Sequence, residues 1–181
     1  MRWSLCFAIL VGMSQSVTIV GAGLAGSEAA LQLADRGVRV RLVEMRPKTP
    51  TLVHVTGCCA ELVCSNSLKS EKPDSAAGML KRELAELGSQ LYAQAKLHAV
   101  PAGGALAVDR TAFAEAVTAL VEAHPLIDLV HEEVVDLVQA AEGADALVVA
   151  AGPLASDALA ASLSRLAGEE HLAFYDAAAP R

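Results

Sequence analysis

The most constraining feature of this sequence is a glycine-rich run, Gly21–Gly26, which reads Gly-Ala-Gly-Leu-Ala-Gly. It stands between a short apolar, β-branched run, Val17–Val20, and a helix-like apolar pattern, Leu24–Arg36, that closes at Gly37. In that setting the first glycine permits a tight turn, the second lets the backbone approach a pyrophosphate, and the third lets helix and strand pack closely. The helix N-terminus supplies amide donors. The sequence therefore predicts a dinucleotide pyrophosphate site made by Gly21, Ala22, Gly23, Leu24, Ala25 and Gly26.

A second strand is expected over Val38–Glu44, and it ends on an acidic residue. Glu44 follows Gly26 by 18 residues, close to the spacing of about 20 at which an acidic side chain accepts the ribose hydroxyls in such sites. An acid at this position disfavours a phosphate on that ribose, so FAD or NAD fits this site better than NADP. The strand, helix and strand form one βαβ unit, which is expected to be right-handed.

The middle of the chain, Met45–Pro73, lacks periodicity and is expected to be a loop with a short helix around Glu61–Leu68. A long helix is predicted from Asp74 or Ser75 to about Leu97. Its four leucines form one apolar stripe, which we assign to the core: Leu80, Leu84, Leu87 and Leu91.

Strands and helices continue to alternate in the second half of the chain. A strand at Leu106–Val108 precedes a helix that Asp109 caps and that runs through Ala123. Three more strands are expected, the first two as antiparallel partners: Ile127–Val130, Val134–Val138 and Ala146–Val149. A final helix opens at Ser156 or Asp157. The pattern predicts an α/β fold, a doubly wound parallel-sheet FAD/NAD(P)-binding (Rossmann-like) domain.

Length and composition indicate a globular chain with one domain, or one domain and a fragment, because 181 residues are 54% hydrophobic and 19% charged. They exclude a disordered or collagen-like chain. The net charge of −7 gives no global attraction to nucleic acid or to an acidic membrane, so such a partner needs a local basic patch. Two basic stretches are candidates for RNA contact, although a solvated surface is the simpler interpretation: Arg36, Arg39, Arg41, Arg46 and Lys48, and Lys69, Lys72, Lys81 and Arg82.

Cys64 is the candidate nucleophile, since it lies among small polar residues in the long loop. A thiolate there attacks an electrophile, whereas the alternative is a buried structural cysteine. No metal site is expected, because the spacing of His54, Cys58, Cys59 and Cys64 matches no common zinc motif. The few clustered cysteines favour reduced thiols over a disulfide framework.

The N-terminal residues 1–15 are expected to be an extension that is not native or not ordered. The apolar run Trp3–Val11 is too short to span a bilayer, and no convincing cleavage site follows it. The natural start is therefore expected at Met13, and no membrane association is predicted.

The sequence resembles the folate- and FAD-dependent tRNA (uracil-5-)-methyltransferase family, TrmFO. The matching stretches are in family order from about Val17 to the end: Val20–Ala30, Glu44–Pro47, Ala60–Leu68, Val100–Arg110, Glu132–Val134, Gly152–Pro153 and Phe174–Pro180. The loop before Cys64 departs from the family, whose members usually carry a histidine and an acidic-basic pair where this chain has Val55, Gly57 and Cys58-Cys59. Because the family continues past Pro180, residues 16–181 are expected to be the N-terminal part of the FAD-binding domain, incomplete at its C-terminal end.

The resemblance implies a cytoplasmic enzyme that holds FAD and reduces it with NAD(P)H. It implies transfer of a one-carbon unit from methylenetetrahydrofolate to C5 of a T-loop uridine in tRNA. On this basis Gly21–Gly26 hold the FAD pyrophosphate, Glu44 its ribose, with Arg46 as a helper and Val134 near the adenine. Cys64 matches the family's catalytic cysteine, either as the nucleophile toward uracil C6 or as a thiol that manages the flavin-bound carbon.

Two other functions stay open from the sequence. One is a different flavoprotein, either a generic FAD-dependent NAD(P)H oxidoreductase or a wobble-uridine tRNA modification flavoprotein. The other is an inactive fragment that only binds nucleotide.

Overall fold

A four-stranded parallel sheet forms the centre of the computed structural model, which describes residues 15–168. The strand order is β6-β2-β1-β7, with bounds β1 Ser16–Val20, β2 Arg39–Glu44, β6 Ile127–His131 and β7 Ala146–Val149. Val17 pairs with Val40 on one side and with Ala146 on the other. The expectations for nearly all of the N-terminal extension and for Phe174–Pro180 lie outside the described residues.

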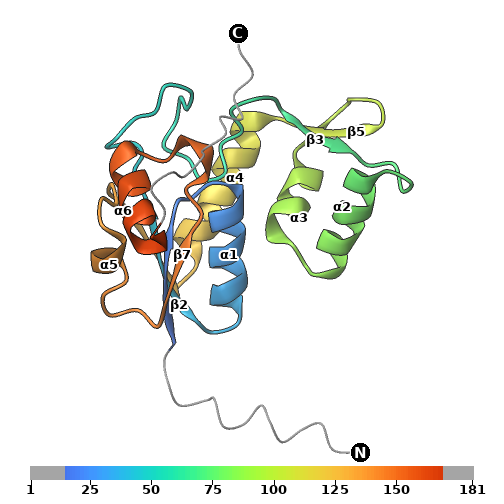
Figure 1. The fold of residues 1–181 in the computed structure, drawn as a ribbon. Coiled ribbons are helices and arrows are strands. Elements are labelled where there is room, and N and C mark those ends of the chain that lie inside the picture. Colours follow the sequence, from blue (N-terminus) through green and yellow to red (C-terminus); the bar gives the residue numbers. More distant parts are fainter. Residues whose placement is uncertain (1–14, 169–181) are drawn as a thin grey trace, which may run out of the picture.

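Helices cover both faces of this sheet (Figure 1). The helices α1 (Leu24–Asp35) and α4 (Arg110–Ala123) pack on one face, where Ile19 and Leu42 belong to the larger buried cluster. The helices α5 (Leu137–Ala140) and α6 (Asp157–Ala167) lie on the other, where Val20 and Val43 contact Leu159 in a second cluster. This confirms the predicted doubly wound α/β fold.

The chain reverses its direction across the sheet at β1. From β1 it moves outward to β2 and then β6, and it returns to β7 on the other side of β1. In open parallel sheets, ligands bind outside the carboxyl ends of the strands at such a reversal point. Gly21 follows β1 and Glu44 ends β2, so both lie at this edge.

A second, smaller sheet is antiparallel, in the order β3-β5-β4, with β3 at Ser67–Ser70, β4 at Ala99–Val100 and β5 at Ala105–Val108. It lies beside helices α2 (Ala76–Glu86) and α3 (Gln90–Leu97) (Figure 1). The predicted short helix around Glu61–Leu68 is wrong, because Ser67 pairs with Ala107 of β5 and the chain is extended there.

The predicted single helix up to Leu97 is also wrong. The chain breaks at Gly88, whose φ is +71°, and the Ser89 side chain caps a new helix by accepting from the Tyr92 N–H. The leucine stripe is divided by the break, and its members differ in burial: Leu91 is buried, whereas Leu80 and Leu87 are 55% and 72% exposed. The core assignment therefore fails for these two leucines.

The predicted strand Val134–Val138 is a third error. Asp136 caps the short helix α5 by accepting from the N–H groups of Val138 and Gln139. The expected antiparallel pairing is wrong as well, because β6 pairs in parallel with β2. The caps expected at Asp109 and Ser156 are confirmed.

In the part of the chain that the structure describes, no helix is both long and apolar enough to cross a membrane.

Candidate functional site

Two glycines of the run Gly21–Gly26 are required by the fold itself. Gly21 has a φ of +101°, and a Cβ atom there would lie 2.7 Å from the carbonyl oxygen of Ala150, next to β7. A Cβ atom on Gly26 would lie 1.8 Å from the carbonyl oxygen of Gly21. Because these two residues have no side chain, α1 lies close against the ends of β1 and β7, as the first and third glycines of the motif predict.

Gly23 is different, because nothing in the fold requires a glycine there. Its φ is −69°, which any residue adopts, and a Cβ atom would meet nothing within 4 Å. Gly23 precedes α1 without a side-chain cap, and the first turn of α1 carries no acidic residue. The amide groups at this helix start therefore face open space suited to an anion.

Glu44 fixes a carboxylate beside this open space. The Ala22 N–H donates to Oε2 of Glu44 (2.8 Å), and Oε1 accepts from the backbone N–H of Arg46 (3.1 Å) and from its Nε (2.8 Å). Burial raises the pKa of Glu44, but the hydrogen bonds from Arg46 and Ala22 outweigh it, so the pKa lies below its ordinary value. Glu44 is thus a buried anionic acceptor at the end of β2.

Arg46, whose side chain is 3% exposed, lies between two carboxylates. Besides Glu44, its Nη1 donates to Oε2 of Glu61 (3.0 Å) and to the carbonyl oxygen of Thr56 (3.3 Å). The His131 ring contacts the Arg46 carbonyl oxygen through Nδ1. The resemblance implied that Arg46 helps in cofactor binding, and one of its contacts is with Glu44, the carboxylate assigned to the ribose.

Sequence reasoning missed Glu61. Its carboxylate accepts from the N–H groups of Val55 (2.8 Å) and Thr56 (3.1 Å) and from Oγ1 of Thr56 (2.7 Å). Burial raises the pKa of Glu61, and these hydrogen bonds more than reverse it, so the pKa is lowered. The available indication was an acid inside the stretch Ala60–Leu68 that carries the resemblance.

The segment before Cys64 is attached to the glycine-rich loop. The Ala60 N–H donates to the carbonyl oxygen of Ala22 (2.8 Å), and the Cys59 N–H donates to Oγ1 of Thr118 on α4 (2.9 Å). Cys64 itself is exposed, so the alternative of a buried structural cysteine is wrong for it. That description fits Cys59, which is 1% exposed and whose pKa burial raises to about 11.

Val134 lies at the same edge of the sheet, although not in a strand. It is 8% exposed and lines a small hollow together with Gly21, Glu44 and Ser156. The structure therefore brings together the glycine-rich loop, Glu44, Arg46 and Val134.

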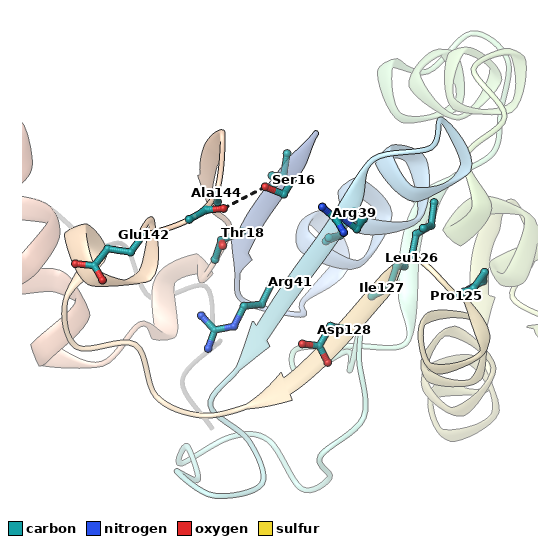
Figure 2. A pocket seen from close by; sticks show the side chains of 13 residues that line it. Ser16, Thr18, Arg39, Arg41, Pro125, Leu126, Ile127, Asp128, Glu142 and Ala144 are labelled. Atoms are coloured by element: carbon teal, nitrogen blue, oxygen red, sulfur yellow. Dashed lines mark hydrogen bonds between the residues drawn. The ribbon is translucent and has the colours of Figure 1, made fainter. Parts of the chain in front are cut away.

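A larger hollow of about 350 Å³ lies at the opposite end of the sheet (Figure 2). It is lined by the amino-terminal ends of β1 and β2, including Ser16 and Arg39, and it is therefore remote from the edge where parallel sheets bind ligands. Arg41 on its rim forms an ion pair with Glu132, and Arg46 is buried elsewhere, so this basic stretch does not form one surface.

Within residues 15–168, no group of three or more histidine, cysteine, aspartate and glutamate side chains is arranged to hold a metal ion.

Comparison with known proteins agrees with the sequence resemblance. Residues 16–181 match the family model described as Glucose inhibited division protein A. Two curated relatives carry the name methylenetetrahydrofolate--tRNA-(uracil-5-)-methyltransferase TrmFO. The one from Desulforudis audaxviator is 54% identical over 168 residues, 93% of this chain and 37% of the relative. The one from Symbiobacterium thermophilum is 56% identical over 164 residues, 91% of this chain and 36% of the relative.

A solved structure, the 6-hydroxypseudooxynicotine amine oxidase HisD from Pseudomonas geniculata, matches 77% of this chain and 14% of its own, with 17% identity and a TM-score of 0.39. The chain spans somewhat more than a third of the length of the curated relatives. The family match covers residues 16–181 without interruption, and the chain belongs to the Glucose inhibited division protein A family.

Proposed function

We propose that this chain forms the FAD-binding part of a tRNA (uracil-5-)-methyltransferase that uses methylenetetrahydrofolate and NAD(P)H. The observation that carries the proposal is Gly23, since neither its φ nor its surroundings require a glycine, and the space that a Cβ would occupy is open. A nearby anionic acceptor, Glu44, fits a ribose, and the open helix start fits a diphosphate. The residues present therefore fit the ADP half of FAD.

Each residue of the site has a separate role in binding. The N–H groups at the start of α1 stabilise the diphosphate, while Gly23 leaves it room. Glu44 accepts the ribose hydroxyls, and Arg46 keeps the Glu44 carboxylate charged and oriented. Val134 offers an apolar surface to the adenine. FAD, when bound, supplies the redox chemistry that the protein side chains lack.

Cys64 is proposed as the nucleophile toward the uracil. Its thiolate adds to C6, so that an S–C6 bond forms and the electron pair of the C5=C6 bond moves toward C5 and the O4 enolate. C5 then attacks the methylene carbon of the folate donor and forms a C5–C bond. After loss of the C5 proton, the bond from this carbon to the tetrahydrofolate nitrogen breaks, so that tetrahydrofolate leaves and an exocyclic methylene stays on C5. A hydride, which NAD(P)H would supply through FAD, adds to the methylene to give the methyl group, and departure of the thiolate from C6 restores the C5=C6 bond. The exposure of Cys64 supports this role, because a tRNA base must reach the sulfur.

The relatives support the substrates. Their names specify methylenetetrahydrofolate, tRNA and position 5 of uracil. We propose a T-loop uridine as the target and the cytoplasm as the location, where tRNA is modified.

Two experiments test the proposal. The purified chain should retain FAD, seen as flavin absorbance after gel filtration, and Gly23→Val should release it because the side chain fills the diphosphate space. A variant that stays yellow would refute the site. For methyl transfer, a chimera in which this chain replaces the matching part of the Symbiobacterium thermophilum relative should methylate a tRNA transcript, and Cys64→Ala should abolish this while FAD stays bound.

The alternatives predict other results. If the chain belongs to a generic FAD-dependent oxidoreductase, or to a flavoprotein that modifies another tRNA position, the chimera would oxidise NAD(P)H. It would not methylate C5 of uracil, with or without Cys64→Ala. A fragment that only binds nucleotide would leave the chimera without either activity.

A further inference from the structure

Glu61 connects the nucleotide side of the site to the segment that carries Cys64. Nη1 of Arg46 donates to Glu61, and Nε of the same arginine donates to Glu44. The three side chains are 8%, 3% and 7% exposed, respectively, for Glu61, Arg46 and Glu44. They form an uninterrupted series of buried charged groups from Glu44, the carboxylate assigned to the ribose, through Arg46 to Glu61.

The other contacts of Glu61 hold the loop that precedes the cysteines. One carboxylate oxygen accepts from Val55, and the other accepts twice from Thr56. Immediately before Glu61, Ala60 donates to the carbonyl oxygen of Ala22 in the glycine-rich loop. Three residues after Glu61 the chain reaches Cys64, which is exposed. Glu61 therefore fixes this segment to the nucleotide site, together with the hydrogen bonds from Arg46 to Thr56 and from Ala60 to Ala22.

We propose that Glu61 is a positioning residue that couples nucleotide bound at Glu44 to the placement of Cys64. The inference rests on the proposed function, which assigns the ribose to Glu44 and the reaction with uracil to Cys64. A ribose hydroxyl that donates to Glu44 stabilises the carboxylate in the place where it holds Arg46, and Arg46 in turn holds Glu61. Nucleotide binding at Glu44 then changes the free energy of placing Cys64. The placement of Cys64 changes the free energy of nucleotide binding by the same amount, because coupling between two sites is reciprocal.

The test uses ADP as the probe. ADP carries the ribose and the diphosphate but no flavin, so a change in the reactivity of Cys64 does not come from a flavin ring that covers the sulfur. The rate of Cys64 alkylation by iodoacetamide is read by tandem mass spectrometry, with and without saturating ADP. In the unsubstituted protein we expect ADP to change this rate at least about fivefold, the lower end of typical coupling between sites.

The main variant is Glu61→Gln, which keeps the size of the side chain and removes its charge. In this variant we expect the alkylation rates with and without ADP to differ by less than about twofold. A difference that small lies below the typical range of coupling between sites. Thr56→Val removes one of the hydrogen bonds to Glu61 at an exposed residue, and we expect a smaller change in the same direction. The matched control is Glu122→Gln, the same change at an exposed position near the end of α4, which should leave the ratio of the two rates unaltered.

The outcomes separate this inference from the function on which it rests. The coupling is overturned if the ratio persists in Glu61→Gln. It is also overturned if the unsubstituted protein binds ADP without any change in the alkylation rate of Cys64. Neither result contradicts the nucleotide site. Failure of the unsubstituted protein to bind either ADP or FAD overturns the proposed function instead. If Glu61 only stabilises the fold, both alkylation rates change by one factor and the ratio stays. If Glu61→Gln does not fold, Thr56→Val decides by the same ratio.

Discussion

A Cβ atom on Gly26 would lie 1.8 Å from the carbonyl oxygen of Gly21, so α1 passes the end of β1 at a distance that no side chain permits. We predict that Gly26→Ala forces the backbone of the loop to shift. Overpacking of this kind typically costs about 1–3 kcal/mol. Urea unfolding should show a lower midpoint by that amount, and FAD affinity should fall with it.

Gly23→Ala is the matched comparison, because it makes the same change where nothing lies within 4 Å of the new methyl group. We predict a change in the free energy of unfolding of less than about 1 kcal/mol, the usual effect of alanine at a helix N-cap. FAD affinity should nevertheless fall, as the methyl group enters the diphosphate space. A Gly23→Ala protein that is as destabilised as Gly26→Ala would show that the fold, not the ligand, requires this glycine.

The βαβ unit was predictable because its determinants are local. The apolar run of β1, the glycines and the helical spacing of α1 all act within about twenty residues, and they agree with one another. The break at Gly88 was not predictable in the same way. Leucine spacing continues across it and hides two local signals, a glycine that ends α2 with a positive φ and Ser89, which caps α3. Contacts of Ser89 with Glu28 on α1 then fix α3 in place.

The candidate site shows the same division. Glu44 was predictable from its position at a strand end, whereas the role of Arg46 between two carboxylates depends on the loop that brings Glu61 to it. That loop has no periodicity, so nothing in the sequence places residue 61 against residue 46. Val134 was expected in a strand, and that element is wrong, since residues 132–136 leave the sheet before α5.

Glu28 gives a prediction about stability away from the site. From α1, its carboxylate accepts from Oγ of Ser89 and from the N–H groups of Gln90 and Leu91, so it caps α3 from another helix. Glu28→Ala leaves these donors without their acceptor, and an unsatisfied buried group costs about 1–3 kcal/mol. Urea unfolding should show this loss, and hydrogen exchange at residues 89–91 should accelerate. Exposed Glu86→Ala on α2 is the control; an equal loss there would contradict the capping role.

The lowered pKa values of Glu44 and Glu61 predict a loss of stability in acid. A carboxyl group whose pKa is lower in the folded state contributes stability that is present above its unfolded pKa, near 4.5, and is lost as pH falls through the folded value. The free energy of unfolding should therefore be maintained down to about pH 5 and decrease below it. Glu44→Gln should flatten this decrease, and exposed Glu115→Gln should not. An unfolding free energy that is independent of pH between 5 and 3 would contradict the buried charge network.

Cys59 and Cys64 should differ sharply in reactivity, although only five positions separate them. Cys59 is buried and its pKa is raised to about 11, so at pH 8 only about one thiol in a thousand is the reactive thiolate. Cys64 is exposed. With iodoacetamide under native conditions, we predict modification at Cys64 and protection at Cys59, read by mass spectrometry of the peptide that contains both. Urea should abolish the difference, because unfolding exposes Cys59 and returns its pKa toward 9.0. Equal native rates would place Cys59 at the surface and remove the reason for assigning the chemistry to Cys64 rather than to its neighbour.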